Sequence, residues 1–482
     1  MRLFPSLCRL SRSAISGFRP VMEPLVVIYG STGTGKSDLA VELATRFNGE
    51  IINADAMQMY EGLPIITNKI TTEEQKGIPH HLLGNIGLDE ETWTAAVFKR
   101  EATKTIREIR SRGKLPIVVG GSSYYIDGLL FDDRLVAEDP FSHQHDDAAN
   151  LSTTTREEVA ARFPILSASG EEMLKKLREV DPVMADRWHP NDARKIRTSL
   201  EIYLATGRRA SDIYAEQAAR KASKYTEQSH SSPWRAVLFW LYAKPELLNE
   251  RLDKRVDKMV ANGLLDETSE VYNYLQQQLA AGQTMDRTKG IWQSIGFKQF
   301  EPYLSSLKST DTTPESAELE KLKQQGIEDT KTATRRYAKY QVRWITTKTI
   351  TSLQDEKVLD KFYLLDSSDL KSWDDEVSRK GTQLTQQFLD EQPLPKPMDI
   401  SETAREVLAQ TIAKSNKQDT PCNRTCDYCG TTVLTEELWQ RHVNGRRHKK
   451  AVQYAKRTAL VVVPDQQLQT VEIMALPDTE PS

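Results

Sequence analysis

One segment near the N-terminus constrains the fold more than any other part of the chain. Residues 30–37, Gly-Ser-Thr-Gly-Thr-Gly-Lys-Ser, fit the phosphate-binding pattern G-x-x-x-x-G-K-[ST]. An apolar run at 24–29 precedes them and predicts a buried strand, and residues 37–47 follow with helical periodicity. Strand, glycine-rich turn and helix together form the context in which such a loop holds phosphate. A glycine turn with an incidental lysine is the competing explanation, and this context disfavours it.

Each part of this loop has a chemical role. Its glycines let successive backbone N–H groups point at phosphate oxygens at a helix N-terminus. Lys36 adds a positive charge, and Ser37 can hold Mg²⁺. The sequence therefore predicts a polyphosphate ligand with Mg²⁺ as cofactor, bound by Gly30, Ser31, Thr32, Gly33, Thr34, Gly35, Lys36 and Ser37.

The first part of the chain alternates between strands and helices. Residues 51–55 and 115–121 predict two further strands, and a basic amphipathic helix at 95–112 lies between them. Such alternation predicts an α/β fold with a parallel sheet and helices on both faces. Ligands bind beyond the carboxyl ends of such strands, so the phosphate loop, Asp55 and the glycine turn at 120–125 should converge.

The rest of the 482-residue chain divides into segments of different character. The region after 170 is helical, and strands at 234–242 and 361–365 return the chain to the sheet. The predicted parts are a presequence at 1–22, a catalytic core at 23–135 and 230–390, a helical insertion domain at 136–229, a linker at 391–420, a finger with a basic flank at 421–457, and a mobile tail at 458–482.

Composition restricts the partners. The net charge of −3 gives no global basic field, so any nucleic-acid site must be local. No apolar run is as long as a membrane span, so we expect no membrane partner. Three of the four cysteines lie between 422 and 429, which favours a metal site in a reducing compartment over a disulfide framework.

The first 22 residues differ from everything after them. They carry arginines at 2, 9, 12 and 19 and no acidic residue before Glu23. This pattern resembles a mitochondrial presequence, and the alternative is a disordered basic tail. Translation from Met22 would give a second pool without the presequence, which we expect in the cytosol and nucleus.

Asp55 and Ser122 are the candidate catalytic side chains beyond the loop. Asp55 ends a predicted strand beside the loop and can be a general base, a Mg²⁺ ligand or a helix N-cap. Ser122 follows Gly120 and Gly121 in a turn where a substrate would lie. The same two glycines also suit a tight strand-to-helix turn with no role in chemistry.

Two basic helices are candidates for nucleic-acid contacts. On the first, Arg194 and Arg197 lie one turn apart; the second, at 332–344, carries Arg335 and Arg336 among aromatic residues. Arginine next to aromatic side chains suits phosphate contacts and base stacking. A solvated basic face and buried core aromatics are the alternatives.

The C-terminal cysteines belong to a metal-binding pattern. Cys426-x₂-Cys429-x₁₂-His442-x₅-His448 supplies two thiolates and two imidazoles at the spacing of a tetrahedral Zn²⁺ site. Several arginines and lysines surround it and suit RNA binding or nuclear import. The sequence therefore predicts a small zinc finger of the C2H2 type.

These features together resemble the tRNA dimethylallyltransferase (tRNA isopentenyltransferase) family. The phosphate loop, the run Asp55-Ala56-Met57-Gln58-Met59-Tyr60 and the turn at 120–125 look like its three active-site segments. Ile78-Pro79-His80-His81-Leu82 and residues 290–297 look like two further landmarks, and the finger is similar to that of eukaryotic members. The match covers about residues 24–390. Three positions depart from the family pattern, where threonine, serine and arginine are usual: Ser122, Ala56 and Tyr340.

The resemblance implies a P-loop NTPase-like core and a specific reaction. A dimethylallyl group passes from its diphosphate to N6 of adenosine 37 in the tRNA anticodon loop, with Asp55 as base and Lys36 and Ser122 assisting. We expect a monomer whose partners are dimethylallyl diphosphate and the anticodon stem-loop. The implied tRNA-binding residues are Asp55, Ala56, Met57, Gln58, Ser122, Arg194, Lys195, Ile196, Arg197, Arg335 and Arg336.

Three other functions remain as alternatives. A P-loop nucleoside or nucleotide kinase would explain the loop but not the finger or the basic helices. A non-enzymatic RNA-binding protein would leave Lys36 and Ser37 without a purpose. An enzyme that alkylates free adenine nucleotides shares the chemistry but has no use for the arginine helices.

Overall fold

The computed structural model describes residues 23–131, 159, 161–224, 234–307, 316–416 and 420–459. The predicted presequence at 1–22 and the tail from 460 lie outside these residues. The chain forms two compact units, one from Met1–Ser142 and Gln217–Lys417, the other from His143–Glu216 and Gln418–Ser482. Each unit is described separately below.

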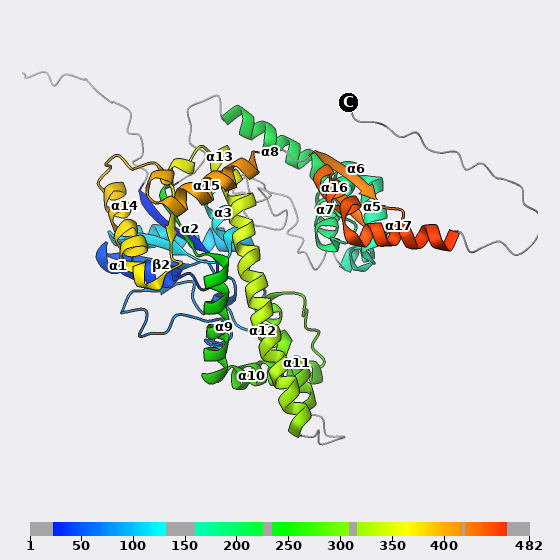
Figure 1. Ribbon diagram of the computed structural model, residues 1–482, viewed down its shortest axis with the longest axis horizontal. Helices are drawn as coiled ribbons and strands as arrows, with labels where there is room; N and C mark the ends of the chain where they lie inside the picture. The colour runs from blue at the N-terminus through cyan, green and yellow to red at the C-terminus, as the bar shows by residue number, and fades with distance from the viewer. Residues whose placement is uncertain are drawn as a thin grey trace, which may run out of the picture. The chain divides into compact units, whose positions relative to one another are not determined.

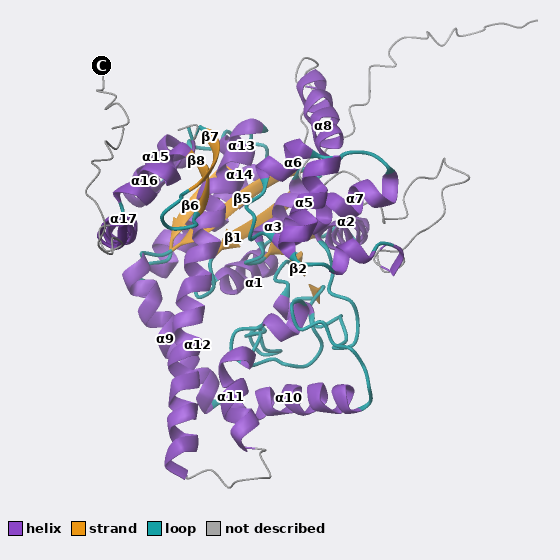
Figure 2. Ribbon diagram, turned by 90° about the vertical axis from the view of Figure 1, so that its right-hand side faces the viewer, coloured by secondary structure: helices purple, strands orange, loops and turns teal. Residues whose placement is uncertain are grey.

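The first unit is built on a six-stranded sheet of order β3-β2-β4-β1-β5-β6 in which every neighbouring pair is parallel. Figure 2 shows these strands in orange among the helices. The predicted parallel sheet is thus confirmed. The strands are β1 (Pro24–Gly30), β2 (Gly49–Asn53), β3 (His80–His81), β4 (Leu115–Val119), β5 (Arg235–Tyr242) and β6 (Phe362–Asp366).

Helices cover both faces of the sheet because the strands are apolar on both sides. Along β1, Val26 and Ile28 belong to one core cluster, and Val27 and Tyr29 to the other. The first cluster includes residues of α1 and α14, the second residues of α2, α3 and α15. These helices are α1 (Lys36–Arg46), α2 (Ala95–Ser111), α3 (Ser123–Leu130), α14 (Lys380–Leu389) and α15 (Glu402–Ser415).

A second layer of long helices extends from the sheet. In Figure 1, α9 and α12 run side by side, and α10 and α11 lie at their far end. The 29-residue α12 continues through a π-helical turn, η5 (Ile345–Thr349), into α13. The bounds are α9 (Pro245–Ala261), α10 (Leu264–Ala280), α11 (Phe297–Leu307), α12 (Ser316–Trp344) and α13 (Ile350–Asp355).

The second unit joins two segments that are far apart in the sequence. His189 Nε2 lies 2.9 Å from the carbonyl oxygen of Thr432, and Asn423 donates to the carbonyl of Asp186. The finger therefore packs with the helical segment rather than standing alone. The elements are α5 (Gly170–Val180), α6 (Pro182–Arg187), α7 (Ala193–Thr206), β7 (Pro421–Thr425), β8 (Thr432–Thr435), α16 (Glu436–Asn444) and α17 (Arg446–Ala459); α8 (Ala210–Lys224) spans the boundary between the units.

The segment expected to be a linker, 391–420, contains ordered structure. Helix α15 begins after the capping side chain of Ser401 and buries Ala404 and Leu408 in the core of the first unit. Its apolar face is short, which is why its sequence looked polar overall. No described helix of either unit is long and apolar enough to cross a membrane.

Candidate active site at the phosphate loop

The phosphate loop connects β1 to α1 and is held by its own side chains. Lys36 Nζ donates to the carbonyl of Ser31 at 2.7 Å, and Thr34 Oγ1 donates to the same oxygen at 2.9 Å. Gly35 has φ 83° and passes beneath Trp373, so that a Cβ there would lie 2.5 Å from the indole ring. Only glycine fits this position.

Asp55 lies just beyond β2 in a tight hydrogen-bonded turn. The side chain of Asn53 accepts from the N–H of Asp55 at 3.1 Å, and Asp55 Oδ1 accepts from the N–H of Met57 at 3.1 Å. This turn leads into the short helix η1 (Met57–Met59), whose N-cap position is Ala56 and has no side-chain cap, so Asp55 is not the N-cap that one alternative proposed. The turn occupies Oδ1 of Asp55, while its Oδ2 faces Gly121 across the site, 3.3 Å from where a Cβ would stand.

The charged groups at the site alter one another's pKa. Burial lowers the pKa of Lys36 to about 8, although the negative charge of Asp55 opposes the shift. Burial raises the pKa of Asp55 above its ordinary value; Lys36, the N–H groups of Met57 and Gln58 and the cation of Arg255 oppose this. A buried carboxylate with a raised pKa is a stronger proton acceptor than an exposed one.

The glycine turn locks the ends of β2 and β4 together. The N–H of Ser122 donates to the carbonyl of Ala54 at 3.2 Å, and Ser122 Oγ accepts from the N–H of Ala56 at 3.0 Å. At Gly120 a Cβ would lie 2.1 Å from the oxygen of Ala54. The turn is therefore both a tight connection and a way of placing the Ser122 hydroxyl beside the segment of Asp55.

Gln341 of α12 joins the two halves of the site. Its Oε1 accepts from the N–H of Thr32 at 2.8 Å, and its Nε2 donates to the carbonyl of Gly121 at 3.0 Å. A Cβ on Gly121 would lie 2.2 Å from that amide nitrogen. Gly121 is thus required for the close approach of α12, a role that its sequence context did not reveal.

Arg255 of α9 is a further site residue that sequence reasoning missed. Its guanidinium donates to Thr32 Oγ1 at 2.6 Å, and its buried Nε has no hydrogen-bond partner among the described residues. Its pKa is lowered by burial and supported by the charge of Asp55. The sequence did carry a signal for this residue. Arg255 lies three residues after the buried Leu252 and seven after the buried Leu248, so the helical spacing places this charged residue on the apolar face of α9.

A pocket of about 220 Å³ opens beside Asp55. Tyr337 in its wall lies within hydrogen-bonding reach of Gln341 and Ser122; burial and then the charge of Asp55 raise the pKa of its phenol, so it stays protonated. Both polar groups and aromatic rings line the pocket. It is lined by Ala56, Gly121, Ser122, Ser123, Tyr124, Tyr125, Tyr337, Tyr340, Gln341 and Trp344.

Two more segments brace this site from outside. In β3, His81 Nε2 lies 2.7 Å from the buried carboxylate of Glu50. In the turn η4 (Gly290–Gln293), Gly290 lies under Tyr60, the last residue of the Asp55 run, and a Cβ there would lie 2.6 Å from the tyrosine oxygen. Both segments are landmarks of the sequence, and both support the elements that carry the site: β3 pairs with β2, and η4 packs against Tyr60.

The predicted RNA-contacting residues fall into different environments. Arg336 and Arg194 are exposed, whereas Arg335 pairs with Asp253 and Arg197 with Glu201 at 2.8 Å. Lys195 pairs with Asp192.

Ile196 is fully buried in the core of the second unit. A contact of this residue with tRNA would therefore be made by its backbone, and its assignment to the tRNA site stays a prediction. The reason for its burial is the register of α7: Ile196 lies on the face that packs inward with Leu200.

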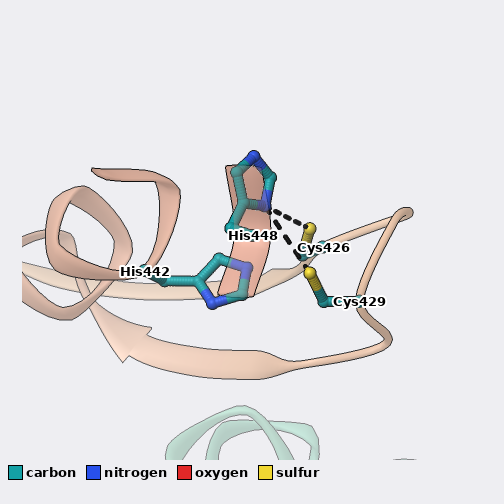
Figure 3. Close-up of side chains that lie close together, drawn as sticks. All are labelled: Cys426, Cys429, His442 and His448. Atoms are coloured by element: carbon teal, nitrogen blue, oxygen red, sulfur yellow. Dashed lines mark hydrogen bonds between the residues drawn. The ribbon is translucent and has the colours of Figure 1, made fainter. Parts of the chain in front are cut away.

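The four predicted zinc ligands converge in the second unit. The ligand atoms of Cys426, Cys429, His442 and His448 all lie within 4.8 Å of one another (Figure 3). His448 Nδ1 is 3.4 Å from one sulfur and 3.6 Å from the other, close to the ~3.5 Å edge of a tetrahedral Zn²⁺ site with ordinary bond lengths. His442 Nε2 is buried without a hydrogen-bond partner among the described residues, as a metal ligand would be. The residues therefore fit Zn²⁺.

Comparison with known proteins agrees with this geometry. A family model described as IPP transferase matches residues 58–348. The chain is 36% identical to the tRNA dimethylallyltransferase of Schizosaccharomyces pombe over 91% of this chain and 97% of that one. The corresponding enzyme of Homo sapiens is 33% identical over 92% of this chain and 89% of its own length.

A solved structure is similar to most of the chain. It is a eukaryotic dimethylallyltransferase acting on tRNA, with a TM-score of 0.71 and 33% sequence identity, covering 91% of this chain and 98% of that one. The similarity thus includes both the sheet with its phosphate loop and the C-terminal part of the chain. The chain belongs to the IPP transferase family.

Proposed function

We propose that the protein transfers a dimethylallyl group from dimethylallyl diphosphate to N6 of adenosine 37 in the tRNA anticodon loop. The observation that carries this proposal is the position of Asp55. Its charge acts on Lys36 and Arg255 at the phosphate loop and on Tyr337 in the pocket. One carboxylate is therefore shared by a site for diphosphate and a site for an acceptor base.

The reaction assigns each group a task. The exocyclic amine is a weak nucleophile because its lone pair is delocalised into the ring, and Asp55 accepts its proton as the C–N bond forms. The allylic C–O bond breaks, and its electron pair leaves with the diphosphate. The loop N–H groups, Lys36 and Arg255 stabilise the negative charge where it develops.

Mg²⁺ is proposed at the same end of the site. Diphosphate oxygens and the hydroxyl of Ser37, on the first turn of α1, form the hard oxygen donor set that Mg²⁺ prefers. Bound there, the ion would neutralise charge on the diphosphate. The fit rests on the donor chemistry of the loop, which also matches other phosphate-transferring enzymes with this motif.

The acceptor base must leave its stack to enter the pocket, which is easiest in a single-stranded loop. We propose that the polar groups of Ala56, Met57, Gln58 and Ser122 meet the target adenosine and its neighbours. The exposed cations, Arg194 and Arg336 foremost, contact the RNA backbone. Arg197, Lys195 and Arg335 are already paired with carboxylates, which partly neutralise their charge and should weaken their contacts with phosphates.

We propose that the finger holds Zn²⁺ and raises affinity for tRNA. The free energy of Zn²⁺ binding stabilises the folded finger, because so small a segment cannot bury enough apolar surface by itself. The exposed Arg441, Arg446, Arg447, Lys449 and Lys450 provide contacts for an RNA backbone.

Mitochondrial delivery through residues 1–22, with a cytosolic and nuclear pool from a start at Met22, is also proposed. Arg2, Arg9, Arg12 and Arg19 without acidic neighbours support it. A fluorescent protein fused after residue 40, with and without Met22→Ala, tests both pools. Loss of the non-mitochondrial pool in the variant is expected, and unchanged distribution contradicts the second start.

An acceptor comparison tests the reaction itself. The protein is incubated with radiolabelled dimethylallyl diphosphate, Mg²⁺ and equal concentrations of tRNA, AMP or ATP. Label in tRNA is expected, with AMP and ATP at least a hundredfold poorer. Preferential labelling of AMP or ATP would identify a nucleotide-alkylating enzyme instead, and phosphate transfer without prenyl transfer would identify a kinase.

A further inference from the structure

A cluster of three aromatic side chains, two of them exposed, lines part of the pocket. Tyr124 meets Trp344 edge-on with ring centroids 5.9 Å apart, and Tyr340 lies 6.2 Å from Trp344 at an interplanar angle of 55°. Tyr124 is 47% exposed and Tyr340 is 56% exposed. We call these three residues the aromatic platform. Exposed aromatic side chains in contact with one another are typical of binding surfaces rather than of bare surface.

The platform is held rigidly from below. Trp344 Nε1 donates to Asp127 Oδ2 at 3.1 Å, and Asp127 is 2% exposed. The same carboxylate accepts from Tyr29 at 3.0 Å and from Thr349 at 3.0 Å. A buried carboxylate satisfied by three donors fixes the indole plane, so a ligand that stacks there does not have to order it.

The position of the platform indicates what binds there. All three residues line the same pocket as Ser122 and Ala56, and Ala56 directly follows Asp55 in the chain. When a base of an RNA strand enters the pocket, the aromatic platform therefore lies beside the neighbouring nucleotides of the same strand. A planar ring with a neighbouring phosphate is the group that this arrangement suits.

Positive charge flanks the platform on the same helix. Arg336, Lys339 and Arg343 are all exposed, and Arg336 lies one helical turn before Tyr340 and Arg343 three residues after it. Aromatic rings that alternate with cations suit a nucleic-acid strand, whose bases stack while its phosphates pair with cations. An acidic protein would use the cations but would gain little from the rings.

We propose that the aromatic platform stacks the nucleobase adjacent to the reacting adenosine, with the exposed ring of Tyr340 as the main stacking contact. The proposal rests on the proposed function for the identity of the RNA. Stacking is tolerant of sequence, because every base has a π-face, and it does not depend on salt. The affinity that Tyr340 contributes should therefore not change with salt concentration, whereas the affinity that Arg336 contributes should.

The test uses the full-length protein and anticodon stem-loops that carry 2-aminopurine on the 5′ or the 3′ side of the target adenosine. Binding to wild type should change the fluorescence of one of the two probes. Tyr340→Phe keeps the ring and should retain that change and the affinity. Tyr340→Ala should lose the change and bind about tenfold more weakly, with an unaltered salt dependence.

Tyr340→Arg supplies the matched charge control, since arginine is common at this position in the family pattern. It should steepen the dependence of binding on salt by about one unit while the probe signal falls. Fluorescence changes that persist in Tyr340→Ala, or affinity within twofold of wild type, overturn the platform. Platform-dependent stacking in a wild type that transfers no prenyl group overturns the proposed reaction and leaves the platform standing.

Discussion

The side-chain oxygen of Gln341 accepts a hydrogen bond from the backbone N–H of Thr32 across 309 positions of sequence. Thr32 belongs to the phosphate loop, and the same amide donates to the carbonyl of Gly121 in the glycine turn. One side chain thus fixes the distance between the site for the departing diphosphate and the site for the acceptor base. Reactions that join two substrates depend on such positioning, because small misplacements cost large factors in rate.

Replacement of Gln341 should impair both substrates' alignment without unfolding the protein. Gln341→Ala removes two hydrogen bonds of about 1 kcal/mol each and should lower kcat/KM by roughly tenfold to thirtyfold. Gln341→Glu should be worse, because it sets a negative charge against the carbonyl of Gly121 and beside bound diphosphate. Steady-state kinetics measure both. A glutamate variant as active as wild type would contradict the bridging role.

Loss of Lys36 should remove transition-state stabilisation. Lys36→Ala takes one charge from the departing diphosphate and should cost on the order of 3 kcal/mol, about a hundredfold in rate. The circular dichroism spectrum should not change, since the hydrogen bond that Lys36 donates to the carbonyl of Ser31 lies within the loop and joins no helix or strand of the core. Activity within threefold of wild type contradicts the assignment.

The same lysine predicts a pH dependence of donor binding. In the unliganded site the pKa of Lys36 is about 8, so its ammonium is present below pH 8 and lost above it. The affinity for dimethylallyl diphosphate, measured without tRNA, should therefore fall as the pH rises through 8. Lys36→Arg keeps its charge at every accessible pH and should bind donor with no such fall. A fall of equal size in the arginine variant would assign the titration to another group.

Adjacent arginines on α12 should differ in their effect on RNA binding. Arg336 is exposed, whereas Arg335 pairs with Asp253. Arg336→Ala should reduce the slope of log K against log salt by about one unit, the value for one lost phosphate contact. Arg335→Ala should reduce it by less, because that cation is already neutralised. Equal effects would show that tRNA displaces the Asp253 partner.

Metal removal should weaken tRNA binding and leave the chemistry intact. His442→Ala opens the Zn²⁺ site in the second unit, while Lys36 and Asp55 belong to the first. The expected result is a raised KM for tRNA with kcat nearly unchanged, the signature of lost uniform binding. Zinc content is measured by atomic absorption on the same samples. A variant that lacks zinc but retains a normal KM would make the finger a localisation or partner-binding module.

Local signals in the sequence predicted the local parts of this site. Strand β1 and helix α1 begin and end within one residue of the apolar run at 24–29 and the periodic stretch at 37–47. The Cys and His spacing likewise predicted four converging ligands. Glycine turns, helical periodicity and metal-ligand spacing are properties of short segments, so they can be recognised in the sequence without knowledge of the tertiary structure.

Other parts depend on packing between distant elements and were not predictable in this way. Arg255 reaches Thr32 over 223 positions and Gln341 reaches it over 309. Neither contact leaves a local motif, although Arg255 breaks the apolar face of its helix. Ile196 shows a related point: the basic stretch predicts RNA contact for the whole segment, but the register of α7 decides which side chains face the core, and that of Ile196 does.

The most direct test of the central claim is nucleoside analysis of tRNA after incubation with donor and either wild type or Asp55→Asn. Wild type should yield N6-isopentenyladenosine, one per tRNA, at adenosine 37. Asp55→Asn keeps the hydrogen-bonding shape but cannot accept the proton, so it should bind tRNA with unchanged affinity and form at least a hundredfold less product. A prenyl group on another atom or nucleotide, or an Asp55→Asn enzyme within tenfold of wild type, would contradict the account.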